Sequence, residues 1–362
     1  MKKIAIIGAG ISGLFIANLF KKNSNYQISI YEKNNSINLD EGYGIQLSVN
    51  SVKLLNKIGF YKFKEEKKFN PDKINFYSIK STKKICDLDI SYFNSKDCKY
   101  TTLKRSDLIN FLNKDVKDLI KHSHSISQIE HENHKIKLTF ENRENSECDY
   151  LIISDGVFSN SKNLISKNPT RPKYNNTLAI RGMIPNSTKI DYKNISLFLG
   201  PNFHQVIYPV SQNGDLNFIA IMRYELTLEK QKNYSLFSES SFIKKVLENV
   251  PKENKVFFET KNDNINLIGD AFFAFQPSFA QGASQSIESA YELFKSIENN
   301  TEGNYFKSRV YKTKMVNNRS KLNQFAFHLS SPFTKFFRNI FLKRLVKNKK
   351  FLESYLGKIY NN

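Results

Sequence analysis

The stretch KIAIIGAGISGLFIANLFKK, residues 3–22, joins a short apolar run, three closely spaced glycines and a second apolar segment. Residues 4–7 are all apolar and end at a glycine, which indicates a buried parallel strand. Apolar residues then recur at helical spacing over residues 14–20. Strand, turn and helix in this order predict a dinucleotide-binding βαβ unit, with the pattern G-x-G-x-x-G at Gly8, Gly10 and Gly13.

Each part of this turn has a physical role. The first glycine permits the tight turn, the second lets backbone approach a pyrophosphate, and the third lets the helix pack close to the strand. Ile11 and Ser12 begin the helix, where unpaired N–H groups favour phosphate. A second apolar strand, at 27–31, ends beside Glu32 and Lys33, and an acid about 20 residues beyond the glycines accepts hydrogen bonds from ribose hydroxyls. We therefore expect all four residues to contact a dinucleotide.

The composition indicates a globular protein. The 362 residues are 40% hydrophobic, and no apolar run approaches the roughly 20 residues that span a bilayer, so we expect a cytoplasmic location. The three cysteines lack the spacing of a zinc or disulfide site, and no metal is predicted. Lys and Arg number 55 against 34 Asp and Glu, a net charge of +21, but they are dispersed with few interleaved aromatics. No specific nucleic-acid partner is expected.

Residues 265–297, INLIGDAFFAFQPSFAQGASQSIESAYELFKSI, predict a strand, a turn at residues 269–270, a loop and a helix. The segment resembles the G-D-A…P…GQGA…E-x-A signature of the FAD-dependent aromatic hydroxylases, the single-component flavoprotein monooxygenases, with salicylate hydroxylase-like and ubiquinone-biosynthesis hydroxylase-like members. The resemblance implies that Asp270 binds ribityl or ribose hydroxyls of FAD and that Pro277 lies beside the reacting edge, as part of the catalytic site. It also implies that backbone N–H groups face the isoalloxazine from Gly282, Ala283 and Ser284.

Three further segments resemble landmarks of that family. Residues 44–47, which include Gln46, resemble the loop under the flavin, and we expect the helix that follows to be capped by Asn50 and closed by Gly59. Arg105 resembles the arginine that touches the cofactor, just before an expected helix N-cap at Ser106. A third segment resembles the D-G motif linked to both FAD and pyridine nucleotide, through Asp155, Gly156 and Ser159.

Two positions depart from the family pattern. Phe273 stands where the usual G-D-A-A-H sequence has His, which changes the packing or the polarity expected near the flavin. Lys162 stands where the D-G motif ends in Arg, which keeps the charge but loses the bidentate fork. The chain has one G-x-G-x-x-G, and the resemblance implies that NADH or NADPH docks transiently rather than in a second Rossmann domain.

The predicted fold is α/β: a Rossmann-type FAD-binding domain with an inserted β-sheet substrate domain and a C-terminal helical segment. The FAD-binding domain is expected at 1–70, 100–165 and 260–300, and the substrate domain at 71–99 and 166–259. Apolar, β-branched runs at 73–79, 195–200, 204–210 and 216–224 read as strands of the inserted sheet. Residues 301–362 form the helical segment.

His204 and Tyr208 share one face of the strand expected at 204–210. They could line the pocket and orient or deprotonate a phenol as catalytic residues, or simply pack within the sheet. Arg181 could anchor a substrate carboxylate or make a plain ion pair.

Residues 333–347 alternate aromatic and basic side chains at helical intervals. Such a helix can lie on an anionic membrane, giving a possible peripheral contact at the inner membrane, but we favour a helix packed on the flavin domain with its basic residues outward.

The leading functional prediction is a monooxygenase that uses NAD(P)H and O2 to hydroxylate a small aromatic, phenolic substrate through a flavin hydroperoxide. The alternatives are a flavin-dependent epoxidase or reductase of a prenyl or quinone-type substrate, and a basic membrane- or nucleic-acid-binding protein that is not an enzyme. Monomer and homodimer both stay open.

Overall fold

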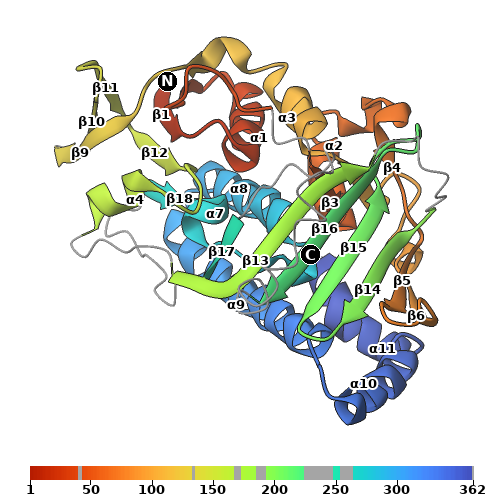
Figure 1. Ribbon diagram of the computed structural model, residues 1–362. Coiled ribbons are helices and arrows are strands. Elements are labelled where there is room, and N and C mark those ends of the chain that lie inside the picture. The colour runs from red at the N-terminus through yellow and green to blue at the C-terminus, as the bar shows by residue number, and fades with distance from the viewer. Residues whose placement is uncertain are drawn as a thin grey trace.

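The computed structural model describes residues 1–39, 43–132, 135–166, 173–184, 193–223, 248–252 and 264–360. Two sheets face each other across the molecule, and long helices run along one side (Figure 1). Much of the predicted segment 166–259 lies outside the described residues.

The first sheet has five strands in the order β18-β12-β1-β2-β8. β1 (Lys2–Ile7) pairs in parallel with β2 (Tyr26–Tyr31) and with β12 (Tyr150–Ile153), and β18 (Ile265–Leu267) and β8 (Ile120–Lys121) extend the two edges. Helices α1 (Ile11–Lys21) and α8 (Gly282–Glu298) pack against each other beside it. The parallel order and the βαβ turn confirm the predicted Rossmann-type region.

The second sheet has seven strands in the order β17-β13-β16-β15-β14-β5-β6. Its strands are β5 (Lys73–Ser78), β6 (Lys84–Asp89), β13 (Lys173–Ile184), β14 (Ile195–Gly200), β15 (Phe203–Pro209), β16 (Leu216–Arg223) and β17 (Glu248–Lys252). They come from two stretches of chain that interrupt the first sheet. The predicted domain boundaries stay a prediction, which this separation into two sheets supports.

Smaller elements complete the nucleotide-binding part. One three-stranded sheet contains β9 (Ile126–Glu132), β10 (Lys135–Phe140) and β11 (Asn145–Cys148), and another contains β3 (Gly44–Leu47), β4 (Lys68–Phe69) and β7 (Thr101–Lys104). The short helices are α2 (Val49–Asn56), α3 (Arg105–Asn113), α4 (Asn160–Ile165) and α7 (Gly269–Phe272).

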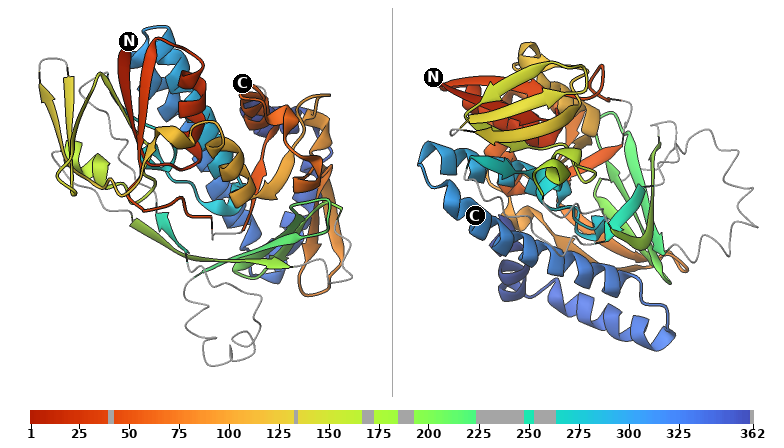
Figure 2. Two further views of the ribbon diagram at one scale, coloured as in Figure 1. Left: turned by 90° about the horizontal axis from the view of Figure 1, so that it is seen from above. Right: turned by 90° about the vertical axis from the view of Figure 1, so that its left-hand side faces the viewer.

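The C-terminal residues form α9 (Glu302–Phe327), α10 (Pro332–Leu345), α11 (Lys349–Leu352), a π-helical turn at Glu353–Gly357 and α12 (Lys358–Tyr360). α9 packs on α8, whereas α10 packs on β6 of the second sheet, as the blue helices of Figure 2 show. The expectation for residues 333–347 is wrong in its packing partner, because α10 packs on the second sheet and not on the flavin domain. The basic residues of this segment face outward as expected at Lys343, Arg344 and Lys347, whereas Arg338 is buried and several phenylalanines also face outward.

Two predicted helix starts are also wrong. Ser48, not Asn50, is the N-cap of α2, because the Ser48 carbonyl accepts the first helical hydrogen bond from Val52 N–H (3.1 Å). α3 begins at Arg105 with Lys104 as N-cap rather than at Ser106, because Lys104 is still held extended by pairing with β3. The predicted close of α2 is supported, since Gly59 has a φ of 93° and donates to the Asn56 carbonyl.

Candidate active site

A cavity of about 1180 Å³ lies between the two sheets and the C-terminal helices. Its wall brings together residues predicted from distant parts of the chain: Gly10, Ile11, Ser12, Gln46, Arg105, Arg181, His204, Tyr208, Asp270, Pro277, Gly282 and Ala283. The other predicted site residues, Gly8, Gly13, Glu32, Lys33, Asp155 and Ser284, lie outside this wall.

The glycine turn has the geometry that the sequence predicts. Gly8 has a φ of 98°, and a Cβ at Gly13 would lie 2.1 Å from the Gly8 carbonyl oxygen, so both positions exclude larger residues. A Cβ at Gly10 would meet no atom within 4 Å. Gly10 therefore borders open space at the N-terminus of α1, where N–H groups and the helix dipole favour phosphate.

The N-terminus of α8 also faces the cavity. Gly282 and Ala283 line the wall, and a Cβ at Gly282 would meet nothing within 4 Å. The Ser284 side chain points elsewhere: its Oγ accepts a hydrogen bond from Ser48 N–H at 3.0 Å. Ser284 can therefore offer the cavity only its backbone, as the sequence predicts, while its hydroxyl ties α8 to α2.

Glu32 lies at the end of β2, beside the turn. Its Oε2 accepts a hydrogen bond from Ala9 N–H and its Oε1 one from Asn34 N–H, both at 3.0 Å. These bonds fix the carboxylate next to the glycines and leave further lone pairs on both oxygens. The adjacent Lys33 is exposed. Ribose contacts for these two residues stay a prediction.

The two acidic residues of the later motifs differ in setting. Asp270 is exposed, lines the cavity and follows Gly269, which has a φ of 60°. Asp155 instead accepts hydrogen bonds from the Ser161 hydroxyl (2.7 Å) and N–H (3.2 Å), and its buried Oδ1 has no partner among the described residues. The neighbouring Ser159 caps α4 by accepting from Lys162 N–H (3.0 Å), while Gly156 of the same motif lines the cavity wall. A cofactor contact for this motif stays a prediction.

His204 and Tyr208 lie on the cavity side of β15, and both are almost fully buried. His204 Nδ1 is 2.9 Å from Nε2 of His328, a residue that the sequence gave no reason to select. Burial and the neighbouring imidazole lower the pKa of His204 well below its usual value, and burial lowers the pKa of His328 to about 4. The pair is therefore neutral at pH 7.

Tyr208 belongs to a hydrogen-bonded group in the cavity wall. Burial raises its pKa, although a nearby Arg181 and hydrogen bonds with Gln46 and Asn217 act in the opposite direction. Gln46 Oε1 also accepts a hydrogen bond from Tyr100 OH at 2.7 Å. Tyr208 is therefore a protonated donor at neutral pH.

Two arginines complete this part of the wall. The Arg181 guanidinium lies 4.6 Å from the centre of the Tyr43 ring, a cation–π contact that orients it toward the cavity. Arg105 is held by its backbone N–H, which donates to the Tyr43 carbonyl at 2.9 Å. A carboxylate-binding role for Arg181 stays a prediction.

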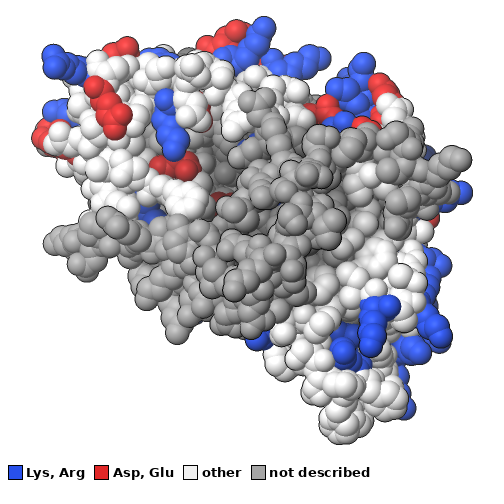
Figure 3. Space-filling view, in the orientation of Figure 1, with Lys and Arg blue, Asp and Glu red and all other residues white. Residues whose placement is uncertain are grey.

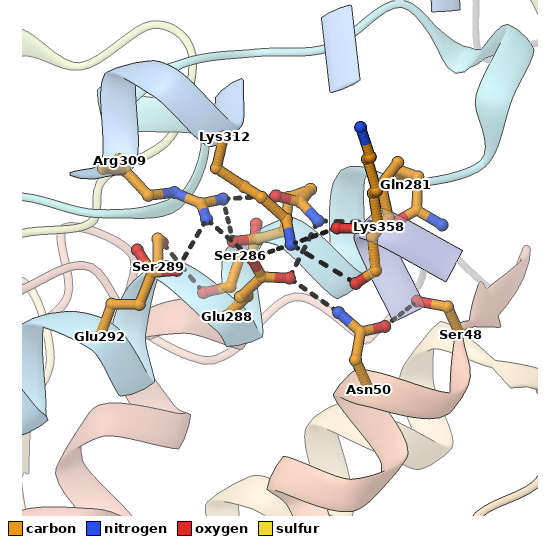
Figure 4. A network of polar contacts seen from close by, with 12 residues as sticks. Ser48, Asn50, Gln281, Ser286, Glu288, Ser289, Glu292, Arg309, Lys312 and Lys358 are labelled. Atoms are coloured by element: carbon orange, nitrogen blue, oxygen red, sulfur yellow. Dashed lines mark hydrogen bonds and ion pairs between the residues drawn. The ribbon is translucent and has the colours of Figure 1, made fainter. Parts of the chain in front are cut away.

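Behind α8 lies a buried polar network that sequence reasoning missed (Figure 4). Glu288 Oε1 lies 3.3 Å from both Arg309 Nη1 and Lys312 Nζ, and its Oε2 accepts from Asn50 Nδ2 at 2.7 Å. Arg309 Nη2 donates to the Gln285 carbonyl at 2.9 Å. The network joins α2, α8 and α9 directly under the helix end that faces the cavity. The only signal in the sequence was the presence of charged residues, Glu288, Arg309 and Lys312, in segments expected to be helical.

Phe273 lies directly behind the cavity wall. It is buried in an apolar cluster with Ala271, Phe272 and residues of β10 and β12, and its ring centre is 5.1 Å from that of Phe275, which lines the wall. An effect of this substitution on packing or polarity near the flavin stays a prediction. Pro277 begins a 3-10 turn and does line the wall.

Comparisons with known proteins agree with this architecture. The sequence model of the NAD(P)-binding Rossmann-like domain matches residues 6–39. A 3-amino-4-hydroxybenzoate 2-monooxygenase of Streptomyces platensis is 21% identical over 313 residues, with 80% of this chain and 78% of the relative covered.

Solved structures match over nearly the whole chain. HpxO of Klebsiella pneumoniae, solved with FAD and uric acid, has a TM-score of 0.82 at 16% identity, covering 98% of this chain and 97% of that one. A salicylate hydroxylase substrate complex has a TM-score of 0.77 at 17% identity, covering 100% and 95%. Fold and relatives thus confirm the resemblance of this chain to the FAD-dependent aromatic hydroxylases.

Proposed function

We propose that the protein is an FAD-dependent monooxygenase that uses NADH or NADPH and O2 to hydroxylate an aromatic, phenolic substrate. The observation that carries the proposal is the wall of one cavity. It joins two helix N-termini that present open glycines, Gly10 and Gly282, to a polar group on the facing sheet that contains His204 and Tyr208.

The residues at the N-termini of α1 and α8, together with Glu32 and Asp270, fit FAD. The N-terminus of α1 would bind the pyrophosphate, Glu32 the ribose, and Asp270 the ribityl or ribose hydroxyls. The first N–H groups of α8 would face the isoalloxazine, where the helix dipole favours negative charge. When bound, FAD supplies the redox chemistry with O2 and the nicotinamide. Pro277 and Phe279 would help exclude water beside it.

The facing sheet would orient the substrate. In the tautomer of His204 that donates its Nδ1 proton to His328, Nε2 would accept a hydrogen bond from a substrate hydroxyl. Tyr208 would donate a hydrogen bond, since burial keeps it protonated. A hydrogen bond accepted from the substrate hydroxyl increases electron density on the ring, which favours attack on an electrophilic oxygen.

The test is oxidation of NADH and of NADPH in ¹⁸O2 by FAD-loaded protein, with and without phenolic acids, anilines and polyprenyl phenols. We expect one compound to stimulate turnover and to gain one ¹⁸O atom. Asp270→Ala should lower the FAD content of the purified protein, whereas Asp118→Ala, at an exposed site outside the cavity wall, should leave it unchanged. Unchanged flavin content in Asp270→Ala would contradict the placement of the site.

A second candidate is epoxidation or reduction of a prenyl or quinone-type substrate on the same scaffold. It is favoured by one observation: much of the cavity wall at the α10 end is phenylalanine and leucine. A product that gains ¹⁸O across an alkene, or a substrate reduced without oxygen uptake, would select it over hydroxylation.

A further inference from the structure

The outward face of α10 is unusually apolar for a protein surface. Phe333, Phe336, Phe337 and Phe341 are 71%, 61%, 41% and 58% exposed. At the end of the neighbouring α9, Leu322 and Phe325 are exposed as well. We call these six side chains the α10 face. A contiguous exposed aromatic group of this kind marks an interaction site.

Basic side chains lie among these aromatics. Lys343 and Arg344 on α10, and Lys347 just beyond its last residue, are exposed. Figure 3 shows this region, at the lower right, as blue and white surface. From residue 303 to residue 352 the sequence has thirteen Lys and Arg and no Asp or Glu, and of these thirteen Arg309, Lys312 and Arg338 are buried. The face is therefore both apolar and strongly cationic.

We propose that the α10 face docks on the surface of a bilayer that contains anionic phospholipid. Phenylalanine rings would insert at the level of the headgroups, and the flexible basic chains would reach the phosphates around them. A second copy of the chain fits less well, because pairing two such faces would bring two cationic groups together. No helix among the described residues is long and apolar enough to cross a membrane, so the contact would be peripheral.

The docked face is continuous with the candidate active site. Leu322, Phe325, Phe333, Phe337 and Phe341 line the same cavity as Pro277 and His204, so the cavity opens among the side chains that would enter the membrane. This continuity assigns a substrate class to the proposed function, on which this part rests. The substrate would carry an apolar chain and pass from the bilayer along α10, with its aromatic end toward the flavin.

The test is sedimentation with vesicles made of phosphatidylglycerol and phosphatidylcholine in equal parts, compared with phosphatidylcholine alone. We expect the FAD-loaded protein to bind the anionic vesicles and to release them as salt rises. Lys343→Glu with Lys347→Glu, and separately Phe336→Ser, should each weaken binding about tenfold. The matched controls are Lys114→Glu with Lys117→Glu, and Tyr61→Ser, which change exposed residues of the same kinds elsewhere.

Three outcomes overturn the proposal. The first is no binding to anionic vesicles at low salt, and the second is an equal loss of binding in the control variants. The third is that Phe336→Ser changes the oligomeric state of the protein and leaves vesicle binding unchanged. Absorbance of bound FAD shows that each variant is folded. A separate arm places a polyprenyl phenol in the two kinds of vesicle and measures NAD(P)H oxidation. Vesicle binding without turnover would contradict the proposed function and leave the membrane contact standing, whereas turnover equal in both kinds of vesicle would contradict delivery through this face.

Discussion

Replacing Glu288 with Gln tests whether the buried network holds the cavity-facing end of α8. Arg309 and Lys312 are 2% and 5% exposed, and both lie 3.3 Å from Glu288 Oε1. The substitution keeps an acceptor for Asn50 but removes the negative charge between two buried cations. Breaking a buried ion pair by removing one partner costs about 3–5 kcal/mol. That is a large part of the stability of a typical protein. Because Glu292 Oε1 also lies 3.6 Å from Arg309 Nη1, the cation that loses its carboxylate partner is mainly Lys312.

The assay is urea unfolding of the FAD-loaded protein at pH 7. We expect Glu288→Gln to lower the free energy of unfolding by about 3–5 kcal/mol and to weaken FAD retention, since Arg309 also binds the Gln285 carbonyl in the first turn of α8. Glu298→Gln, at the half-buried far end of the same helix, should cost under about 1 kcal/mol. Arg309→Met should cost less in the Glu288→Gln background than alone. Additive effects, or a loss no greater than that of the control, would refute this account.

Three further predictions follow from the described contacts. Gly10→Ala should fold normally but lose FAD, because its Cβ would enter open space in the cavity. Gly13→Ala should instead lower the stability of the fold, because its Cβ would lie 2.1 Å from a carbonyl oxygen. Visible absorbance of FAD measures the first effect and urea unfolding measures the second. Burial raises the pKa of Glu292, so the native state keeps a proton that the unfolded chain releases. The free energy of unfolding should therefore fall as pH rises above 4.5, the ordinary pKa of a glutamate. Glu292→Gln should remove that fall, and parallel curves of stability against pH for the variant and the parent protein would contradict this prediction. Burial lowers the pKa values of His204 and His328, so acid should destabilise the protein between pH 6.5 and about 4, by up to about 1.4 kcal/mol per pH unit for each imidazole; an unchanged slope in the double Asn variant would rule this out.

The nucleotide-binding part could be predicted because its constraints are local. A turn at φ 98°, a helix that approaches a carbonyl and a strand that ends at an acid all leave their mark within some 30 residues of sequence. The same holds for the later strand, glycine turn and helix at residues 265–297. The backbone requires glycine at Gly8, Gly13 and Gly269, so this part of the pattern is visible without any knowledge of tertiary contacts.

The errors arose where long-range contacts decide the structure. Asn50 has a good capping side chain, but Glu288 on a distant helix binds it, so Ser48 takes the cap position. Residues 333–347 were expected to pack on the flavin domain, yet α10 packs on β6, with Arg338 turned inward and several phenylalanines exposed beside Lys343 and Arg344. Periodicity shows that a helix has two faces, and it does not show which face finds a partner.

The same contrast explains why the sequence indicates the cofactor better than the substrate. At the end of the cavity where we propose that the cofactor binds, the groups that would bind it are mostly backbone N–H groups, which glycine positions reveal. At the other end they are side chains from separate elements: His204 on β15 depends on His328 beyond α9, and Gln46 on β3 depends on Tyr100. Such pairs, 124 and 54 residues apart, leave no local pattern. In a scaffold of this kind, replacing a few side chains of the cavity wall can change the substrate without changing the cofactor. The substrate therefore has to be assigned from the side chains of the cavity wall and not from the local sequence pattern.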